Sequence, residues 1–170
     1  VNEELAATAA WGTQMIKLYD QPKIDGVFSL WYGKGPGLDR AMDAIRHANM
    51  GGSSKLGGML LAVADDPIGK SSTLAYQSEQ SLISAGIPIF YPANVHEVVP
   101  LGLQAYQLSR HAGICVGLKI TADTADSSAV VDLTSLRPKF KSLLNIENVH
   151  IQKHESALDR EETLFTKRLP

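Results

Sequence analysis

The continuous apolar run from Gly58 to Ala64 is the feature that most constrains the fold of this chain. A run of this length is typical of a strand in a parallel sheet that is covered on both faces. It ends at Asp65-Asp66-Pro67, which predicts a loop at the carboxyl end of the strand. A sheet with helices packed on both sides is therefore the first expectation.

Strand and helix patterns alternate along most of the chain. Strands are predicted at 26–32, 58–64, 87–91 and 114–121, and helices at 3–18, 38–50, 72–85 and 95–110. Strand–helix units of about 30 residues predict a doubly wound α/β fold, with a mostly parallel sheet and helices on both faces. Ligands bind such sheets at the carboxyl ends of the strands. The loops expected at that edge are 33–39, 65–72, 92–94 and 121–128.

Composition excludes several classes of function. With 170 residues, 44% of them hydrophobic, the chain can form one domain with a sizeable core. A net charge of −2 gives no electrostatic reason to expect nucleic acid or an anionic membrane as a partner. No apolar run is long enough to cross a bilayer and no signal peptide is recognisable, so a cytoplasmic location is expected. The single cysteine, Cys115, is expected to be an inert core thiol, and it cannot by itself hold an iron–sulfur cluster.

The first helix carries an acidic residue at its start. Asn2 is a plausible N-cap, Glu3 opens the helix, and Gly12 follows nine residues later, so the alanines between can lie flat against a neighbouring element. A carboxylate in this position suits holding a proton for a nitrogen heterocycle. On position alone, Glu3 and Glu4 are more simply explained as ordinary first-turn acids that favour the helix dipole.

The segment Gly33-Lys34-Gly35-Pro36-Gly37 is predicted to be a loop after a strand. A glycine-rich loop can cradle a phosphate, but the spacing and the terminal Lys-Ser/Thr of a Walker A motif are missing here. The alternative is a tight strand-to-helix turn without a ligand. Both interpretations stay open at this point.

No metal site is predicted in this chain. Asp65 and Asp66 could share a metal ion or a proton, but no further acidic ligand lies near them in the sequence. A structural loop is therefore favoured, with Ser71 or Ser72 as the N-cap of the next helix. The histidines do not show the spacing of a zinc site.

A series of motifs in a fixed order carries a family resemblance. They are Glu3 with Gly12, Trp31-Tyr32-Gly33-Lys34-Gly35-Pro36-Gly37, His47-Ala48-Asn49, Gly57 to Pro67, Lys70-Ser71-Ser72, Gln77-Ser78-Glu79-Gln80 and Ile87 to Asn94. In this order and spacing, residues 1–132 resemble the indolepyruvate:ferredoxin oxidoreductase family, within the 2-oxoacid:ferredoxin oxidoreductases. The resemblance implies a thiamine diphosphate pyrimidine-binding domain. Because a strand and loop precede the glutamate in that family, the domain is expected to be incomplete at its N-terminus.

The resemblance also implies roles for particular residues. Glu3 would be catalytic, hydrogen-bonding the aminopyrimidine ring of thiamine diphosphate, and Gly35, Gly37 and Asp66 would help to line the cofactor site. Lys34 and Ser71 would bind the 2-oxoacid substrate. Where many relatives have a histidine-containing loop, this chain has Ile68-Gly69-Lys70, which leaves the substrate preference open.

The remaining parts of such an enzyme would come from other domains. The resemblance implies a diphosphate-binding domain or subunit that holds Mg²⁺, iron–sulfur clusters, coenzyme A and ferredoxin as reaction partners, and a homo-oligomeric assembly. The isolated chain is expected to be inactive. Two alternatives remain, a non-catalytic α/β assembly or regulatory module with the same fold, and a small nucleotide-binding protein that uses the glycine loop.

The segment 133–170 is more polar and less regular than the rest of the chain. It is predicted to be a linker or arm that packs on a neighbouring domain. Within it, Arg137-Pro138 is expected to break one helix, and residues 155–168 to form a charged, exposed helix.

Overall fold

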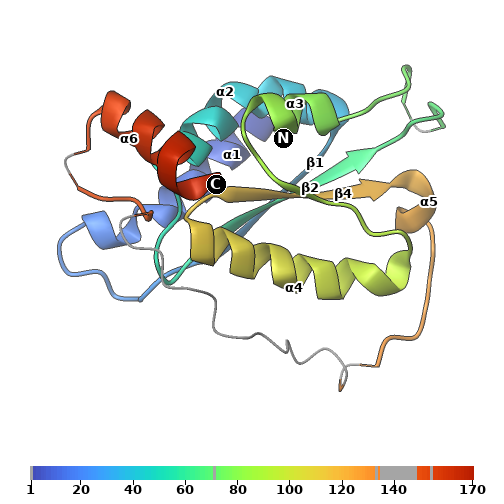
Figure 1. Cartoon of the computed structure of the whole chain (residues 1–170). Helices are drawn as coiled ribbons and strands as arrows, with labels where there is room; N and C mark the ends of the chain where they lie inside the picture. Colours follow the sequence, from blue (N-terminus) through green and yellow to red (C-terminus); the bar gives the residue numbers. More distant parts are fainter. Residues whose placement is uncertain (1, 71, 133, 135–148, 154) are drawn as a thin grey trace.

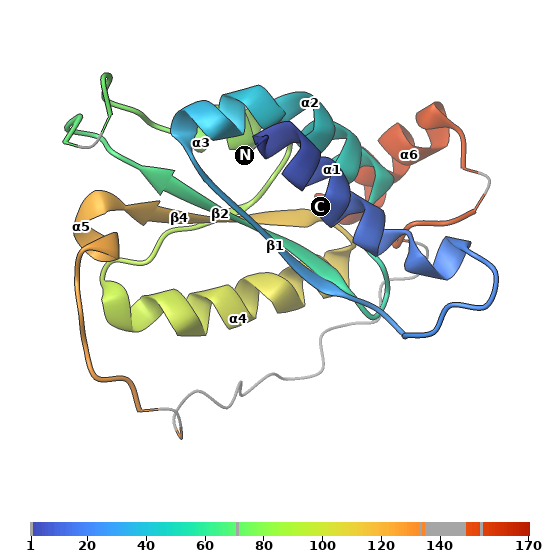
Figure 2. The ribbon, with the colours of Figure 1, turned by 180° about the vertical axis from the view of Figure 1, so that it is seen from behind.

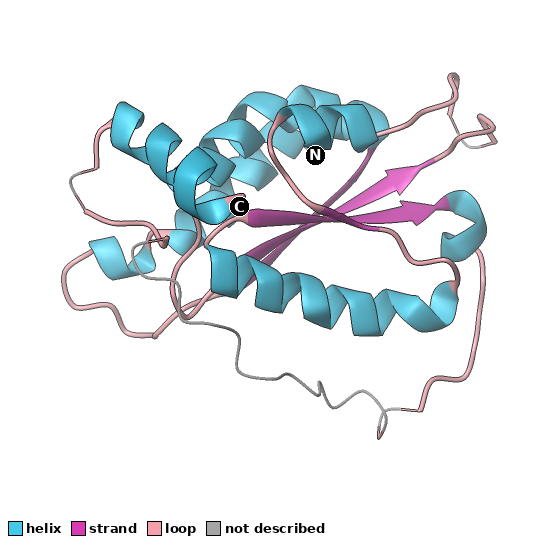
Figure 3. Cartoon of the chain, in the orientation of Figure 1, coloured by secondary structure: helices cyan, strands magenta, loops and turns pink. Residues whose placement is uncertain are grey.

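The computed structural model describes residues 2–70, 72–132, 134, 149–153 and 155–170 (Figure 1). Its strands are β1 (Phe28–Lys34), β2 (Gly58–Asp65), β3 (Ile89–Phe90) and β4 (Cys115–Thr121). Its helices are α1 (Glu3–Gln14), η1 (Ile16–Leu18), α2 (Gly35–Gly51), α3 (Glu79–Ser84), α4 (Val95–Ala112), α5 (Ala122–Ala125), α6 (Ala157–Thr163) and η2 (Leu164–Arg168) (Figure 3).

The described strands form one parallel sheet in the order β1-β2-β4-β3. Helices α1, α2 and α3 lie on one face of this sheet and α4 lies on the other, as the two opposite views show (Figures 1 and 2). The predicted doubly wound α/β fold with helices on both faces is confirmed. Within the described residues, every helix is too short or too polar to cross a bilayer.

The strands differ in how they are covered. Most side chains of β2 and β4 are buried on both faces, as the apolar runs predict, although Ala64 near the end of β2 is exposed. Strand β1 lies at the edge of the sheet and alternates between buried and exposed residues. Ser29 and Trp31 are buried beneath α1 and α2, whereas Leu30 and Tyr32 point to the other face and are exposed.

Helix α1 is fastened to the sheet by the buried side chain of Gln14. Its Nε2 donates to the carbonyl oxygens of Val27 at 3.0 Å and Gly58 at 3.2 Å. Its Oε1 accepts from the backbone N–H of Gly58 at 3.0 Å and of Ser54 at 3.3 Å. One amide group thus adds hydrogen bonds to backbone groups at the starts of β1 and β2, beside the bond from the N–H of Gly58 to the carbonyl oxygen of Val27 at 3.2 Å.

The predicted helix at 72–85 is wrong in its first half. Helix α3 begins only at Glu79, and residues 72–78 form a loop, so Ser72 is not its N-cap. The physical reason is that the carboxylate of Asp65 takes the N–H and the hydroxyl of Ser78, which ties the start of the helix to the end of β2. Ser71 lies outside the described residues.

The predicted glycine loop at 33–37 is also different in the structure. Gly33 and Lys34 are the last residues of β1, and Gly35 is the first residue of α2. Pro36 falls in the first turn of the helix, where a missing N–H breaks no helical hydrogen bond. The strand therefore passes directly into the helix, as in the tight-turn interpretation.

The end of the chain packs on this domain. A helix is present within the predicted range 155–168, starting at Ala157 after a capping box formed by Ser156 and Asp159. It is followed by Arg168, which is buried and donates to the carbonyl oxygens of Val149 and, at 2.8 Å, Met50 near the end of α2. Arg137-Pro138 lies outside the described residues, and contact with a neighbouring domain stays a prediction.

Candidate functional site

A cavity of about 600 Å³ lies at the carboxyl edge of the sheet, where doubly wound folds bind their ligands. Its lining comes from α1, the three strands β1, β2 and β4, and α5. The lining residues are Glu3, Ala6, Leu30, Trp31, Tyr32, Gly33, Lys34, Ala62, Ala64, Ile120 and Ala125. Two residues predicted from the sequence, Glu3 and Lys34, are thus brought together at one cavity.

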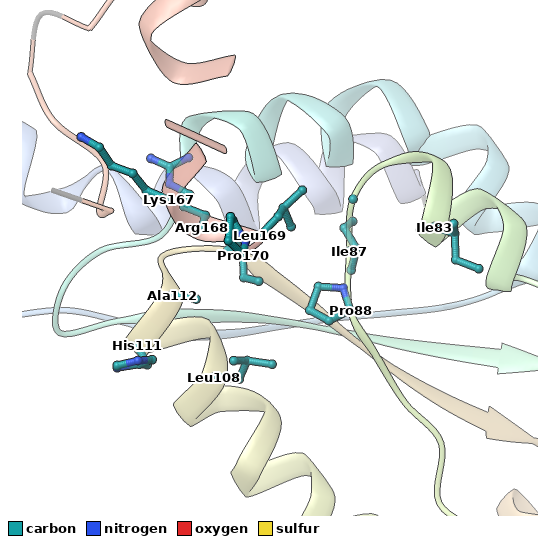
Figure 4. Close-up of a pocket in the computed structure, with 12 residues that line it drawn as sticks. Ile83, Ile87, Pro88, Leu108, His111, Ala112, Lys167, Arg168, Leu169 and Pro170 are labelled. Atoms are coloured by element: carbon teal, nitrogen blue, oxygen red, sulfur yellow. The ribbon is translucent and has the colours of Figure 1, made fainter. Parts of the chain in front are cut away.

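A second cavity, of about 520 Å³, lies at the opposite edge of the sheet (Figure 4). It is lined by residues that precede β3 and β4, such as Ile87 and Ile114, by the end of α4, and by the last residues of the chain. None of the candidate cofactor- or substrate-binding residues predicted from the sequence is among its lining residues. The carboxyl-edge cavity is therefore the candidate site.

Helix α1 holds Glu3 at the rim of this cavity. The side chain of Asn2 accepts from the N–H of Leu5 at 3.0 Å, so the predicted N-cap is confirmed and the helix begins at Glu3. The indole Nε1 of Trp31 donates to the carbonyl oxygen of Glu3 at 3.0 Å, which fixes the helix start against β1. Ala7 and Ala10 are buried, whereas Ala6 and Ala9 are exposed, so only part of the expected alanine face packs closely.

The glycine that meets Glu3 is Gly37, in the first turn of α2. A Cβ atom added to Gly37 would lie 2.9 Å from Cγ of Glu3, whereas a Cβ added to Gly12 would meet nothing within 4 Å. The nine-residue spacing from Glu3 to Gly12 therefore has no steric role in this structure. The close approach of backbone to the carboxylate side chain is real, but it comes from a segment distant in the sequence.

Gly35 is required by a second close approach on the same turn. A Cβ atom on Gly35 would lie 1.7 Å from Cδ1 of Tyr76, so the tyrosine ring rests directly on the glycine. The hydroxyl of Tyr76 hydrogen-bonds Asp39 one helical turn further along α2. Burial, together with this bond, raises the pKa of Tyr76. The first turn of α2 thus lies between Glu3 and Tyr76.

We expect Gly35→Ala to destabilise the fold by about 1 to 3 kcal/mol, because the new methyl group must displace the ring of Tyr76. Urea unfolding measures the effect. Gly102→Ala in α4 is a matched control, since its Cβ would make only an ordinary 3.7 Å contact with Leu118. Alanine is the better helix former, so the control should be neutral or more stable than wild type. Equal stability of the two variants would contradict the steric role of Gly35.

Lys34 and Asp66 occupy different places relative to the cavity. Lys34 is exposed on the cavity rim, at the position that precedes α2. Asp66 is buried, and its Oδ1 accepts from the N–H of Lys70 at 2.9 Å while its carbonyl oxygen accepts from the N–H of Tyr76 at 3.1 Å. Asp66 therefore shapes the loop that carries Tyr76 and does not line the cavity itself.

A buried ion cluster lies beside this loop, and sequence reasoning missed it. Lys119 of β4 places its Nζ 3.5 Å from Oδ2 of Asp65 and pairs directly with Glu79 at the start of α3. The ammonium also lies 4.8 Å from the centre of the Tyr91 ring. The available signal was Lys119 itself, a charge within the otherwise apolar run 114–120.

The Glu79–Lys119 pair predicts a loss of stability in acid. Hydrogen bonding to Lys119 lowers the pKa of Glu79 below its ordinary value of 4.5, although burial opposes the shift. A carboxyl group with a lowered folded-state pKa stabilises the fold above its unfolded pKa, and this contribution is lost as the pH falls through the folded pKa. We therefore expect the urea midpoint of wild type to fall more steeply below pH 4.5 than that of Glu79→Gln. Parallel profiles would contradict this assignment.

The other polar residues that the structure describes do not form a metal site. Among the residues that the structure describes, no three His, Cys, Asp or Glu side chains gather in a way that could hold a metal ion. Cys115 is buried, as predicted for a core thiol, and burial raises its pKa to about 12. His47 and His96 are exposed.

Comparison with known protein families finds none that matches this chain, and no curated protein matches it either.

Proposed function

We propose that this chain is the pyrimidine-binding domain of a thiamine diphosphate-dependent 2-oxoacid:ferredoxin oxidoreductase of the indolepyruvate type. The observation that carries the proposal is the position of Glu3. Its side chain lies against Gly37 on the rim of a cavity at the carboxyl edge of a doubly wound sheet. The sequence resemblance singles out the same glutamate and the same glycine turn.

The residues around the cavity fit the aminopyrimidine half of the cofactor. Leu30 and Ile120 offer apolar walls, and Ala62 and Ala64 leave room for a flat ring between them. Glu3 adds one carboxylate acceptor, which is the group that a ring nitrogen bearing a proton needs. When bound, thiamine diphosphate supplies the carbanion chemistry of 2-oxoacid decarboxylation.

In this proposal, Glu3 controls a proton. Its carboxylate would accept a hydrogen bond from a protonated ring nitrogen of the aminopyrimidine and would hold the proton there. Leu30 and Tyr32 are exposed in this chain, so water would be excluded from the cavity once the diphosphate-binding domain covers them, and the lower dielectric constant would then strengthen this interaction. Trp31 contributes by fixing the backbone of Glu3 through its 3.0 Å hydrogen bond.

Lys34 is the candidate for substrate binding. It lies on the same cavity rim as Glu3 and carries a positive charge that suits the carboxylate of a 2-oxoacid. The companion assignment of Ser71 rests on the family resemblance, because that residue lies outside the described part of the chain.

The other components of the reaction are proposed to come from other domains or subunits. The described residues contain no carboxylate cluster suited to Mg²⁺, which would be held with the diphosphate elsewhere. Iron–sulfur clusters, coenzyme A and ferredoxin would likewise contact other parts of the enzyme. Leu30 and Tyr32, exposed beside the cavity, suit an interface with the diphosphate-binding domain in a homo-oligomeric enzyme.

The test is a thiochrome fluorescence assay on the protein purified from its own cells without added cofactor. Near-stoichiometric thiamine diphosphate in wild type, and much less in Glu3→Gln, is the expected result. The isolated 170-residue chain should not reduce viologen dye with a 2-oxoacid. No cofactor in wild type, even after incubation with Mg²⁺ and thiamine diphosphate, would overturn the proposal and favour a non-catalytic module with this fold.

A further inference from the structure

The loop between β2 and α3, residues 66–78, is closed at its base by two neighbouring aspartates. Asp65, at the end of β2, accepts from the N–H of Ser78 at 2.8 Å and from its hydroxyl. Asp66 accepts from the N–H of Tyr76 through its carbonyl oxygen at 3.1 Å. The two ends of the loop are therefore held together by hydrogen bonds to the strand end, and we call Asp65, Asp66, Tyr76 and Ser78 the loop base.

Lys119 supplies the positive charge at this loop base. Its side chain is only 6% exposed, and its ammonium pairs with Asp65 at 3.5 Å and with Glu79 directly after Ser78. The side chain of Asp65 is fully buried and that of Glu79 is 33% exposed, so without Lys119 the charge of Asp65 would lose its counter-charge in a place that water does not reach. One lysine thus joins β4 to the end of β2 and to the start of α3.

The loop base in turn sets the position of Tyr76. The Tyr76 ring rests on Gly35, and its hydroxyl bonds Asp39, so this side chain packs along the first turn of α2. Glu3 packs on Gly37 of the same turn. A contiguous set of contacts therefore runs from Lys119 through the loop base and Tyr76 to the helical turn that carries Glu3.

We propose that Lys119 is a positioning residue, which fixes the loop base through Asp65 and Glu79 and thereby holds Tyr76 on the helical turn beside Glu3. The consequence for cofactor binding rests on the proposed function, whereas the placement of Tyr76 does not. Lys119 acts through other residues and does not line the cavity that contains Glu3.

The experiment measures how accessible Tyr76 is to tetranitromethane, with nitrated peptides quantified by mass spectrometry. Tyr19, which is exposed and distant from the loop, is the internal reference. We expect Lys119→Met to raise the Tyr76 to Tyr19 nitration ratio by about tenfold or more, because two carboxylates lose their shared counter-charge. Lys119→Arg keeps the charge and should restore most of the protection. Circular dichroism verifies that each variant is folded.

Lys70→Met is the matched control. Lys70 belongs to the same loop and forms a 2.8 Å ion pair with Asp126, but both side chains are exposed. Loss of an exposed pair should change the nitration ratio by no more than about twofold. If Lys119→Met does not fold, Ser78→Ala takes its place, since it removes one hydrogen bond to Asp65 and should raise the ratio by about fivefold.

The outcomes separate this inference from the proposed function. An unchanged ratio in folded Lys119→Met, or in Ser78→Ala if that variant must be used, would overturn the positioning role whether or not the protein binds thiamine diphosphate. A raised nitration ratio in Lys119→Met that returns toward the wild-type value in Lys119→Arg supports the positioning role, again whether or not the protein binds thiamine diphosphate. If wild type binds the cofactor, Lys119→Met should bind it at least about tenfold more weakly, and equal affinity would overturn the link to the site.

Discussion

Glu3→Gln is expected to lower 2-oxoacid-dependent ferredoxin reduction by about 10² to 10⁴-fold, the range found for positioned proton-transfer groups. The amide keeps the shape of the side chain beside Gly37 but loses the negative charge that favours a proton on the pyrimidine ring. Steady-state kinetics with saturating thiamine diphosphate and Mg²⁺ measures the effect. Saturation is required so that a loss of affinity is not mistaken for a loss of rate.

Glu4→Gln is the control that the chain itself offers. Glu4 is adjacent to Glu3 in the same first helical turn, and its side chain is exposed and absent from the cavity lining. Both substitutions remove one acidic group near the helix N-terminus, so they should cost a similar small amount of stability, about 0.3 to 1 kcal/mol. Only Glu3→Gln should lose activity. Equal activities of the two variants would mean that Glu3 is an ordinary first-turn acid.

Gln14→Ala is expected to have the largest effect on stability, about 3 kcal/mol or more. The side chain is 1% exposed, and its removal leaves the N–H of Ser54 without this acceptor. The carbonyl oxygens of Val27 and Gly58 lose their shorter hydrogen bonds and keep only those from the N–H of Gly58 at 3.2 Å and the hydroxyl of Ser29 at 3.4 Å. Buried backbone groups that lose their hydrogen bonds carry their full desolvation cost, and the vacated volume adds a cavity cost. Urea unfolding followed by tryptophan fluorescence measures the change, since Trp31 lies under α1.

Gln80→Ala is the corresponding control on an exposed helix surface. Gln80 lies in α3 and is exposed, so its replacement should change the free energy of unfolding by no more than about 0.5 kcal/mol. A small effect of Gln14→Ala, within about 1 kcal/mol of this control, would show that other groups or water satisfy the backbone at the starts of β1 and β2.

The most buried elements were those that the sequence predicts best. The apolar run at 58–64 and the run at 114–121 became β2 and β4 almost without change, because burial on both faces demands apolar side chains at nearly every position. The start of α1 was equally clear, since an N-cap is a local hydrogen bond between Asn2 and Leu5. In both cases the pattern that predicts the element lies within a few consecutive residues.

The errors lie where distant segments compete for the same backbone groups. Residues 72–78 precede α3 without joining it, because the buried carboxylate of Asp65 takes the backbone N–H of Ser78. Gly35 and Gly37 suggested a loop, yet they belong to a helix and are required by the side chains of Tyr76 and Glu3. Neither partner can be identified from the sequence around the glycines.

The sequence by itself determined the class of fold, the order of the elements and the edge of the sheet where a ligand is expected. The reason is that the spacing of apolar residues within a short segment indicates whether that segment forms a helix or a buried strand. Only the tertiary structure decided which side chains meet there. Lys119 and Glu79 are 40 residues apart, and Gln14 reaches Gly58 across 44. Such contacts form because the parallel sheet places the ends of separate strands side by side, and no local pattern encodes which strand becomes the neighbour of which.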